Sequence, residues 1–394
     1  MTLRILFIHE VNYLRKPIFE MHEFPEYLAA RGHDVYFLHF PEMASSKARS
    51  SQGWKNTIPG RALPDTNLTL LTPRILTSGI IGRLLAAAMG HSIVKRAIRE
   101  SCPDVIVTLA VPTFGWQAVQ VSKKSGTPIV YRALDVSHLI RGGIFGPLVK
   151  MAETFLARRA SFVSANNGAM ADYISELGAR VGGIEVHFPP MALEKYMAGD
   201  RLRGRRLIRV SNSDQVLLYM GSFFYFSGLA EVVQEFARLT REPNLKLVLV
   251  GGGELDGELR SLVKDLKLVD QVLFTGFVGF DELPDYLAAA DVLINPMKKS
   301  RVSDTALPNK VIQYLAASRP VVSTNLKGVT LTFEGYSGLH FVNTPEDCMA
   351  KALEMLTNEG QRDFSRNKQL LNDDFGPSTV ISFENFLERV AVSK

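Results

Sequence analysis

Short apolar runs rich in β-branched residues recur along the chain, separated by stretches long enough to form helices. The first series comprises residues 4–8, 34–38, 104–107 and 128–131. The second series comprises residues 216–219, 245–250, 272–275, 292–295 and 320–323. Apolar strands that alternate with helices form parallel sheets covered on both faces. The sequence therefore predicts the α/β class, with two Rossmann-like domains that each contain a parallel sheet.

Length and composition agree with two folded domains. A chain of 394 residues exceeds one ordinary domain and suits two domains of about 180 to 200 residues. Its 46% hydrophobic and 22% charged residues are typical of a folded protein. We predict an N-terminal domain over residues 1–200 and a C-terminal domain over residues 205–377. The polar, charge-dense stretch 200–206 lies in a predicted linker, residues 192–212.

Several classes of protein are disfavoured by the same sequence. No run of about 18 apolar residues predicts a transmembrane helix, and the N-terminus does not resemble a signal peptide. Two distant cysteines, Cys102 and Cys348, fit a reducing compartment, so we expect a cytoplasmic protein. The net charge of +5 favours an anionic partner, but no basic motif interleaved with aromatic residues predicts nucleic-acid binding.

Residues 304–322 read as a loop, a short helix and a buried strand. Pro308 suits the first helical position, which leaves the backbone N–H groups of Asn309 and Lys310 at the positive end of the helix. Such an end binds phosphate, and Lys310 adds a full charge there. Gln313 lies three residues further on the same face, where its amide can bond sugar hydroxyls. The segment predicts a diphosphate site with a ribose beside it; an amphipathic helix with a surface lysine is the alternative.

This segment resembles the donor-site helix of GT-B glycosyltransferases. The tail Tyr-Leu-Ala-Ala-Ser-Arg-Pro-Val-Val matches, but Thr305 and Gln313 stand where that family usually has two glutamates. The run Lys-Val-Ile-Gln-Tyr, residues 310–314, is similar to that of the xanthan-type membrane-associated glucuronosyltransferases. The resemblance implies two domains whose sheets face each other across a cleft, with the C-terminal helix, about 378–394, packing back on the first domain.

Other donor contacts are expected at the ends of strands in the second domain. The loop Gly221, Ser222 and Phe223 follows the first strand, where glycine allows close approach to phosphates and the serine can donate a hydrogen bond. The Arg and Lys that clamp the diphosphate in much of the superfamily are absent from this loop. The resemblance places Gly276 and Phe277 against the nucleotide base. A plain turn and a core phenylalanine are the alternatives.

Asp135 is the predicted general base. It follows a parallel strand, so its carboxylate should open into the crevice where such sheets bind ligands. The sequence Tyr-Arg-Ala-Leu-Asp, residues 131–135, is similar to the Tyr-Arg-Ala-Ser-Asp of the glucuronosyltransferase-like group, which implies this role for Asp135 and an acceptor-side position for Arg132. A base of this kind needs a pKa raised by desolvation. An aspartate that caps the next helix is the alternative.

The acceptor side is expected near the end of the first strand. His9, Glu10, Arg15, Lys16 and His22 resemble a His-acid, Arg, Pro, His series of the same group, and the two cations could meet a lipid diphosphate. Residues 70–96 mix large apolar residues with cations and contain no acid, which predicts an anionic membrane surface as a partner or, alternatively, a core helix with a basic edge.

Together these features predict a glycosyltransferase, of hexosyltransferase or glucuronosyltransferase type, that extends a polysaccharide or lipid-linked glycan. The donor is expected to be a nucleotide-diphosphate sugar, with uridine as the base. No Asp-x-Asp motif is present, so we expect no metal ion and no cofactor, and we favour inversion at the sugar. The alternatives are a retaining GT-B glycosyltransferase, a nucleotide-sugar epimerase and a non-catalytic nucleotide-sugar-binding scaffold.

Overall fold

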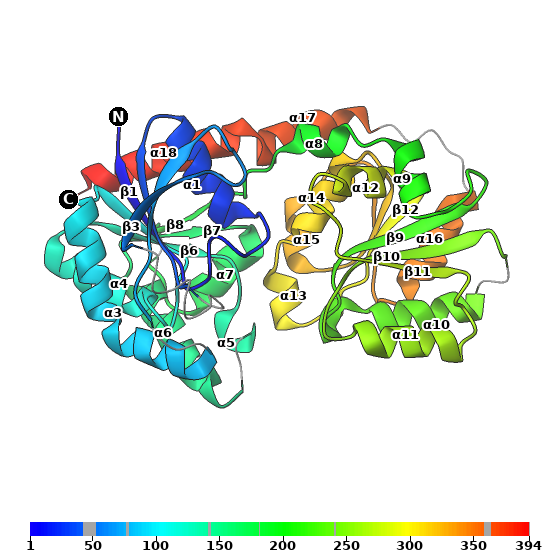
Figure 1. Ribbon diagram of the computed structural model, residues 1–394, viewed down its shortest axis with the longest axis horizontal. Coiled ribbons are helices and arrows are strands. Elements are labelled where there is room, and N and C mark those ends of the chain that lie inside the picture. The colour runs from blue at the N-terminus through cyan, green and yellow to red at the C-terminus, as the bar shows by residue number, and fades with distance from the viewer. Residues whose placement is uncertain are drawn as a thin grey trace. The chain divides into compact units, whose positions relative to one another are not determined.

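The computed structural model describes residues 1–41, 53–75, 79–140, 143–180, 182–239, 242–357 and 364–393. The chain forms two compact units, each with its own sheet and core (Figure 1). The first unit contains Met1–Met191 and Phe375–Lys394, and the second contains Ala192–Asp374. The α/β architecture predicted from the alternating apolar runs is therefore confirmed.

The first unit is built on an eight-stranded sheet with the order β3-β4-β2-β1-β5-β6-β7-β8. All neighbouring strands are parallel except β3 and β4, which are antiparallel. The strands are β1 (Arg4–Ile8), β2 (Asp34–Leu38), β3 (Lys55–Pro59), β4 (Asn67–Leu71), β5 (Val105–Thr108), β6 (Ile129–Ala133), β7 (Phe162–Ala165) and β8 (Ile184–Val186). The order reverses between β1 and β5, so the crevice of this sheet lies beyond the carboxyl ends of those strands.

Helices cover both faces of this sheet (Figure 1). They are α1 (Glu20–Ala30), α3 (Gly79–Ser101), α4 (Gly115–Ser125), α5 (Ser137–Ile140), α6 (Gly146–Arg159) and α7 (Gly168–Glu176), followed near the C-terminus by α18 (Pro377–Val392), with a 3₁₀ turn at Gly143–Phe145. Apolar residues of α3, α4, α6 and α7 share one core with the sheet. Phe24 of α1 and Phe383 of α18 belong to the core on the opposite face, so the C-terminal helix packs on the first unit.

The second unit contains a six-stranded parallel sheet with the order β11-β10-β9-β12-β13-β14. Its strands are β9 (Gln215–Ser222), β10 (Leu245–Gly252), β11 (Val272–Gly276), β12 (Val292–Asn295), β13 (Val321–Thr324) and β14 (Leu339–Val342). Strands β9 and β10 extend beyond their predicted ends, because Gly221 and Ser222 still pair in register with Gly251 and Gly252. The order reverses between β9 and β12, which places the crevice of this sheet at the end of β9.

The helices of the second unit again lie on both sides of its sheet (Figure 1). They are α8 (Leu193–Met197), α9 (Arg201–Leu207), α10 (Leu229–Leu239), α11 (Asp256–Asp265), α12 (Leu283–Ala289), α13 (Arg301–Thr305), α14 (Asn309–Ala316), α15 (Lys327–Thr332), α16 (Asp347–Thr357) and α17 (Ser365–Phe375), with a 3₁₀ turn at Tyr225–Ser227. Helices α10, α11 and α16 contribute to one core with the sheet, and α14 packs against β12 and β13.

The predicted linker, residues 192–212, contains helices α8 and α9. The charge density that suggested a linker has a structural use. The guanidinium of Arg205 is buried, and it donates to Asp291 Oδ2 over 2.9 Å and to the carbonyl oxygen of Asp214 over 2.9 Å. The same carboxylate accepts a hydrogen bond from the backbone N–H of Val216, which ties α9 to the start of β9.

Helix α9 packs so closely on α12 that only glycine fits at position 204. A Cβ atom at Gly204 would lie 1.9 Å from the carbonyl oxygen of Asp285. In an exposed helix, glycine to alanine stabilises by up to about 1 kcal/mol. We expect Gly204→Ala to do the opposite and to destabilise the second unit by about 1–3 kcal/mol through overpacking.

Scanning calorimetry of the purified variant measures this effect. Gly257→Ala is the matched control, because Gly257 also lies in a helix and a Cβ atom there would meet nothing within 4 Å. A Gly204→Ala protein that melts at or above the wild-type temperature would show that α9 and α12 pack less closely than described.

Candidate functional site

The side chain of Lys310 lies over the end of β9. Its Nζ donates a hydrogen bond of 2.9 Å to the hydroxyl of Tyr219 and lies 4.3 Å from the centroid of the Tyr219 ring. The Tyr219 hydroxyl in turn donates to the carbonyl oxygen of Ser222 over 2.9 Å. No carboxylate in the described part of the chain pairs with Lys310. The amine is thus held by a neutral partner at the crevice of the sheet.

Burial lowers the pKa of the Lys310 amine from 10.5 to about 7. The residue as a whole is only partly buried. A lysine whose charge is disfavoured, and which has no anionic partner, gains most when a ligand supplies the negative charge. The environment of Lys310 therefore suits an anion.

Glycine makes room for this arrangement at position 221. Gly221 has a φ of 145°, and a Cβ atom there would lie 3.0 Å from Lys310 Nζ and 3.2 Å from the Tyr219 hydroxyl. The end of the neighbouring strand β10 is equally tight, because a Cβ atom at Gly251 would lie 2.0 Å from the carbonyl oxygen of Gly221. These glycines at the ends of β9 and β10 leave backbone rather than side chains at the rim of the crevice, where a bulky ligand can approach.

Phe223 does not contact this crevice, and its predicted place in the donor site is wrong. Its side chain is fully buried in the core of the second unit, beside Tyr219 and Phe274. Its backbone N–H donates to the carbonyl oxygen of Gly252 over 3.0 Å. The preceding Ser222 is exposed, so its hydroxyl remains available to a ligand.

Phe277 is an exposed aromatic residue at the end of β11. Its side chain is 81% exposed, and a Cβ atom at Gly252 would lie 3.1 Å from its ring. Gly276, with a φ of 71°, provides the turn that brings the ring over the end of β10. An exposed flat ring on this rim can stack on a planar ligand group. A core phenylalanine, the alternative reading, is excluded by the exposure.

Helix α14 begins one residue later than predicted. Pro308 is its N-cap, with φ −70° and ψ 110°, so Asn309 and Lys310 are the first two helical residues. Their N–H groups belong to the first turn, which has no intrahelical acceptors. Gln313 is one turn further along, and its Nε2 donates to the hydroxyl of Tyr196 over 2.8 Å. That bond orients the amide of Gln313 and leaves its oxygen to accept from another group.

Thr305, predicted as a donor contact, has a local structural role instead. Its hydroxyl bonds the carbonyl oxygens of Arg301 at 2.9 Å and Val302 at 3.2 Å within α13. The residue is also buried. Its position in the motif predicted a contact that its side-chain geometry does not support.

In the first unit, Asp135 lies just beyond the carboxyl end of β6 and is exposed. Burial of the carboxyl among surrounding protein atoms, followed by the negative charges of Glu20 and Glu153, raises its pKa from 3.8 to about 6, although water still reaches the side chain. Asp135 does not cap the next helix. Glu153 accepts the hydrogen bond of the Ser137 N–H at the start of α5, over 3.1 Å. The helix-cap alternative is therefore excluded.

Two predicted acceptor contacts, Arg132 and His22, are buried. The guanidinium of Arg132 is 2% exposed and donates to both carboxylate oxygens of Glu20, at 2.8 and 3.2 Å. His22 bonds the carbonyl oxygen of Tyr13 through Nε2 at 2.8 Å, and burial lowers the pKa of His22 to about 4. Both residues stabilise the first unit, and their prediction as acceptor contacts is wrong.

The remaining acceptor-side predictions divide by exposure. Arg15 and Lys16 are exposed. His9 and Glu10 are buried; Nδ1 of His9 accepts the N–H of Glu10, and Glu10 Oε2 accepts the N–H of Thr113 over 2.8 Å. These two residues join the loops after β1 and β5. Arg15 and Lys16 follow β1, and Asp135 follows β6; these two strands are two strand spacings apart, about 10 Å.

The predicted membrane segment, residues 70–96, is not one helix. Leu70 and Leu71 end strand β4, residues 76–78 lie outside the described residues, and α3 begins at Gly79. No helix in the described ranges is long and apolar enough to cross a membrane. The same ranges hold no group of three or more His, Cys, Asp or Glu side chains that could bind a metal ion.

Sequence reasoning missed Tyr219, although it holds Lys310. Within the run 216–219 it reads as an ordinary apolar strand residue, and only its hydroxyl hints at another role. It also missed Glu20 and Glu153, whose charges act on Asp135. Neither glutamate stands in a recognisable motif, and their partners are distant in sequence.

The chain is similar to glycosyltransferases along most of its length. Residues 21–189 match the family described as "Glycosyl transferase 4-like domain", and residues 214–358 match "Glycosyl transferases group 1". N-acetyl-alpha-D-glucosaminyl L-malate synthase from Bacillus anthracis is 28% identical over 254 residues, which cover 61% of each chain. The lipopolysaccharide core biosynthesis glycosyltransferase LpsE of Rhizobium meliloti is 27% identical over 200 residues, 50% of this chain and 54% of that protein.

Both alignments therefore span less than two thirds of the relative. Among solved structures, Anabaena HepE in complex with UDP and glucose superposes with a TM-score of 0.72 and 19% identity, over 100% of both chains. At this identity the likeness establishes the fold.

The low pKa of Lys310 predicts a pH-dependent cost in stability. In the unfolded chain this lysine keeps its proton up to about pH 10.4, whereas in the fold it loses the proton near pH 7. The cost is therefore absent above the unfolded pKa, grows as the pH falls to about 7, and is constant below. We expect Lys310→Met to be more stable than the wild type at pH 7, by a margin that shrinks at pH 9.5.

Urea denaturation at the two pH values measures this margin. Lys264→Met is the control, because Lys264 is exposed on α11 and its substitution by Met removes the same charge. The difference in unfolding free energy between Lys264→Met and the wild type should not change with pH. A margin for Lys310→Met that is equally independent of pH would contradict a lowered pKa.

Proposed function

Because the chain belongs to the GT-B glycosyltransferase family, with a matching family domain in each half, we propose that it transfers a sugar from a nucleotide-diphosphate sugar to a glycan acceptor. The observation that carries this proposal is the Lys310 amine, which has no carboxylate partner among the described residues and lies at the crevice of the second sheet. The acceptor is a polysaccharide or a lipid-linked glycan, and the donor base is uridine.

The second unit offers a separate group for each part of a uridine diphosphate sugar. The diphosphate lies against the Lys310 amine and the first turn of α14, with the backbone of Gly221 and the hydroxyl of Ser222 on its other side. The base stacks on the exposed ring of Phe277. The free amide oxygen of Gln313 accepts from a sugar hydroxyl, since its nitrogen is bonded to Tyr196.

Lys310 also supplies the charge that transfer requires. When the bond between the anomeric carbon and the diphosphate breaks, the leaving oxygen gains negative charge, and a protonated amine beside it stabilises that charge. Binding of the diphosphate raises the pKa of Lys310 again, so the amine is protonated in the complex. We propose that this charge replaces the metal ion that many sugar transferases use.

Asp135 is the proposed general base. Its carboxylate takes the proton of the acceptor hydroxyl, whose oxygen attacks the anomeric carbon as the diphosphate leaves, which inverts that carbon. A pKa raised to about 6 makes the carboxylate a better base than an ordinary aspartate while keeping it ionised at pH 7. The exposed cations Arg15 and Lys16 lie on the same unit, where their charges would attract an acceptor diphosphate.

We also propose that the protein works at an anionic membrane surface on the cytoplasmic side. Helix α3 exposes the apolar side chains of Ile81, Leu84, Leu85 and Met89. Their spacing keeps them on one side of the helix, as in helices that lie in a membrane interface. A lipid-linked acceptor would be presented at such a surface.

Incubation with a panel of sugars linked to UDP, GDP, ADP and TDP tests the proposed function. Release of nucleoside diphosphate from the uridine donors supports a transferase that reads uridine. A protein that binds these donors without releasing nucleoside diphosphate, with or without acceptor extracts, would be a scaffold instead.

We expect Asp135→Asn to keep donor affinity and to lose about 10²–10⁴ in turnover, the usual effect of removing a general base. Turnover measured against donor affinity separates the chemical role from folding. Asp34→Asn, an exposed aspartate at the start of β2, is the matched control and should keep full activity. The anomeric configuration of the product, read by NMR, must be opposite to that of the donor. A retained configuration or an active Asp135→Asn enzyme would refute this assignment.

A further inference from the structure

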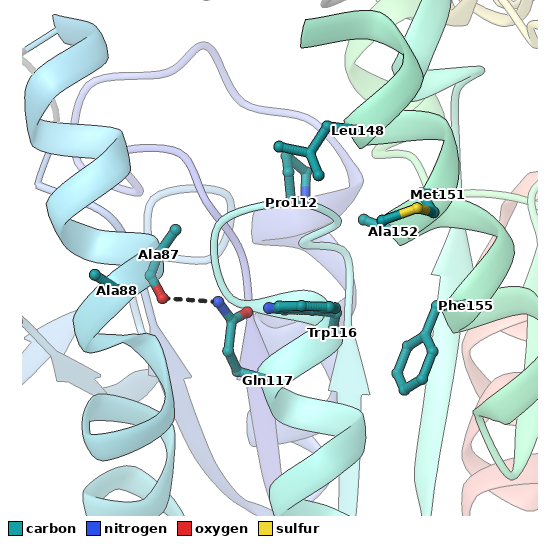
Figure 2. Close-up of a pocket in the computed structure, with 9 residues that line it drawn as sticks. All are labelled: Ala87, Ala88, Pro112, Trp116, Gln117, Leu148, Met151, Ala152 and Phe155. Atoms are coloured by element: carbon teal, nitrogen blue, oxygen red, sulfur yellow. Dashed lines mark hydrogen bonds between the residues drawn. The ribbon is translucent and has the colours of Figure 1, made fainter.

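The first unit contains an apolar pocket between α3, α4 and α6, and none of its lining residues is proposed to take part in transfer. Its volume is about 380 Å³, within the usual range for small-ligand sites. Figure 2 shows Trp116 of α4 opposite Met151 and Phe155 of α6. The amide nitrogen of Gln117 donates to the carbonyl oxygen of Ala87 over 2.9 Å, which fixes α4 against α3 (Figure 2).

Large apolar side chains surround the mouth of this pocket. On α6, Leu148 is 54% and Met151 62% exposed, and both line it. On α3, the exposed row that includes Leu85 and Met89 flanks the lining residue Ala88. Exposed apolar side chains that gather around an apolar pocket favour contact with another apolar body.

A second pocket adjoins the first and is basic. It has a volume of about 690 Å³ and shares Phe155 with the apolar pocket, since both run between α4 and α6. Its lining contains four cations, Lys123, Arg158, Arg159 and Arg180, and no carboxylate side chain. None of the four forms an ion pair with another described residue. Clustered, unpaired cations raise the local potential and attract an anion.

Helix dipoles explain only part of this cluster. Lys123, Arg158 and Arg159 lie in the last turns of α4 and α6, where a cation is favoured without any ligand. Arg180 lies beyond the end of α7, and the dipole does not account for it. Nor does the dipole account for the open apolar pocket that adjoins this basic pocket. The two pockets share Phe155 and together form what we call the groove between α4 and α6.

We propose that this groove binds an anionic membrane phospholipid, with one acyl chain in the apolar pocket and the phosphate head group among Lys123, Arg159 and Arg180. Apolar lining at one end and unpaired cations at the other match the two ends of such a lipid, and the exposed rows on α3 and α6 match the bilayer it comes from. This lipid is neither donor nor acceptor; it would hold the first unit on the membrane. The proposal does not depend on the transfer activity.

Titration with monomeric lauroyl lysophosphatidylglycerol, below its critical micelle concentration, tests the site without vesicles or nucleotide. The chain contains only two tryptophans, Trp54 and Trp116. In a Trp54→Phe background, entry of the acyl chain should shift the emission of Trp116 to the blue. Lauroyl lysophosphatidylcholine carries the same chain without net charge and should bind at least about tenfold more weakly, because each cation near an anionic lipid contributes about 1 kcal/mol.

Two pairs of variants locate the ligand. Lys123→Gln with Arg159→Gln should weaken binding at least about tenfold, whereas Lys124→Gln with Lys150→Gln removes the same charge from α4 and α6 outside the pockets and should leave affinity unchanged. Ala88→Phe should fill the apolar pocket and abolish the emission shift, while Ser92→Phe, one turn further along α3, should not.

Equal binding of the two lipids, equal loss in both charge pairs, or calorimetric binding without a shift in Trp116 emission would overturn the proposal. If the wild-type protein binds the monomeric anionic lipid but does not bind anionic vesicles, the lipid site stands and only its membrane role is refuted. The measurement of UDP binding is independent of these lipid experiments, so the transferase proposal is tested separately.

Discussion

The hydrogen bond from Lys310 to Tyr219 is the interaction on which the proposed site depends. It holds a partly buried amine over the end of β9, at the point where the strand order of the second sheet reverses. Gly221 is required there, because any side chain would occupy the space of the amine. Since the partner of Lys310 is neutral, no negative charge in the unliganded site stabilises the protonated amine, and a bound diphosphate would supply that charge.

The first unit uses its buried charges differently. Glu26 accepts the N–H groups of Arg61, Ala62 and Leu63, at 2.8, 2.6 and 2.7 Å, and so holds that loop in place. Glu20 pairs with Arg132, and Glu153 caps α5. These carboxylates have protein partners and stabilise the fold. By contrast, water reaches the side chain of Asp135, and burial of the carboxyl among surrounding protein atoms, followed by the charges of Glu20 and Glu153, raises its pKa, which makes it the carboxylate best suited to accept a proton.

The sequence predicted two parallel sheets because buried parallel strands are apolar throughout and stand out between helices. It did not predict the edge strand β3 of the first sheet, which is antiparallel to β4. It also predicted Lys310, Gly221 and Phe277 at strand or helix ends, where parallel sheets bind ligands. It failed for Arg132, His22, Thr305 and Phe223, because the partner that buries or bonds each side chain is set by tertiary packing. Motif position indicates where a residue lies along an element. It does not reveal whether the side chain points to the crevice or into the core.

Calorimetric titration of UDP and uridine into the wild type and Lys310→Met, at pH 8 in two buffers of different ionisation enthalpy, tests the central claim most directly. Since the pKa of Lys310 is lowered to about 7, the amine is mostly neutral at this pH, and UDP should bind with uptake of about one proton. Lys310→Met should abolish that uptake and weaken UDP about ten- to a hundred-fold, the effect of one charged hydrogen bond, with little change for uridine. Equal losses for UDP and uridine, or UDP binding without proton uptake in the wild type, would contradict the role assigned to Lys310.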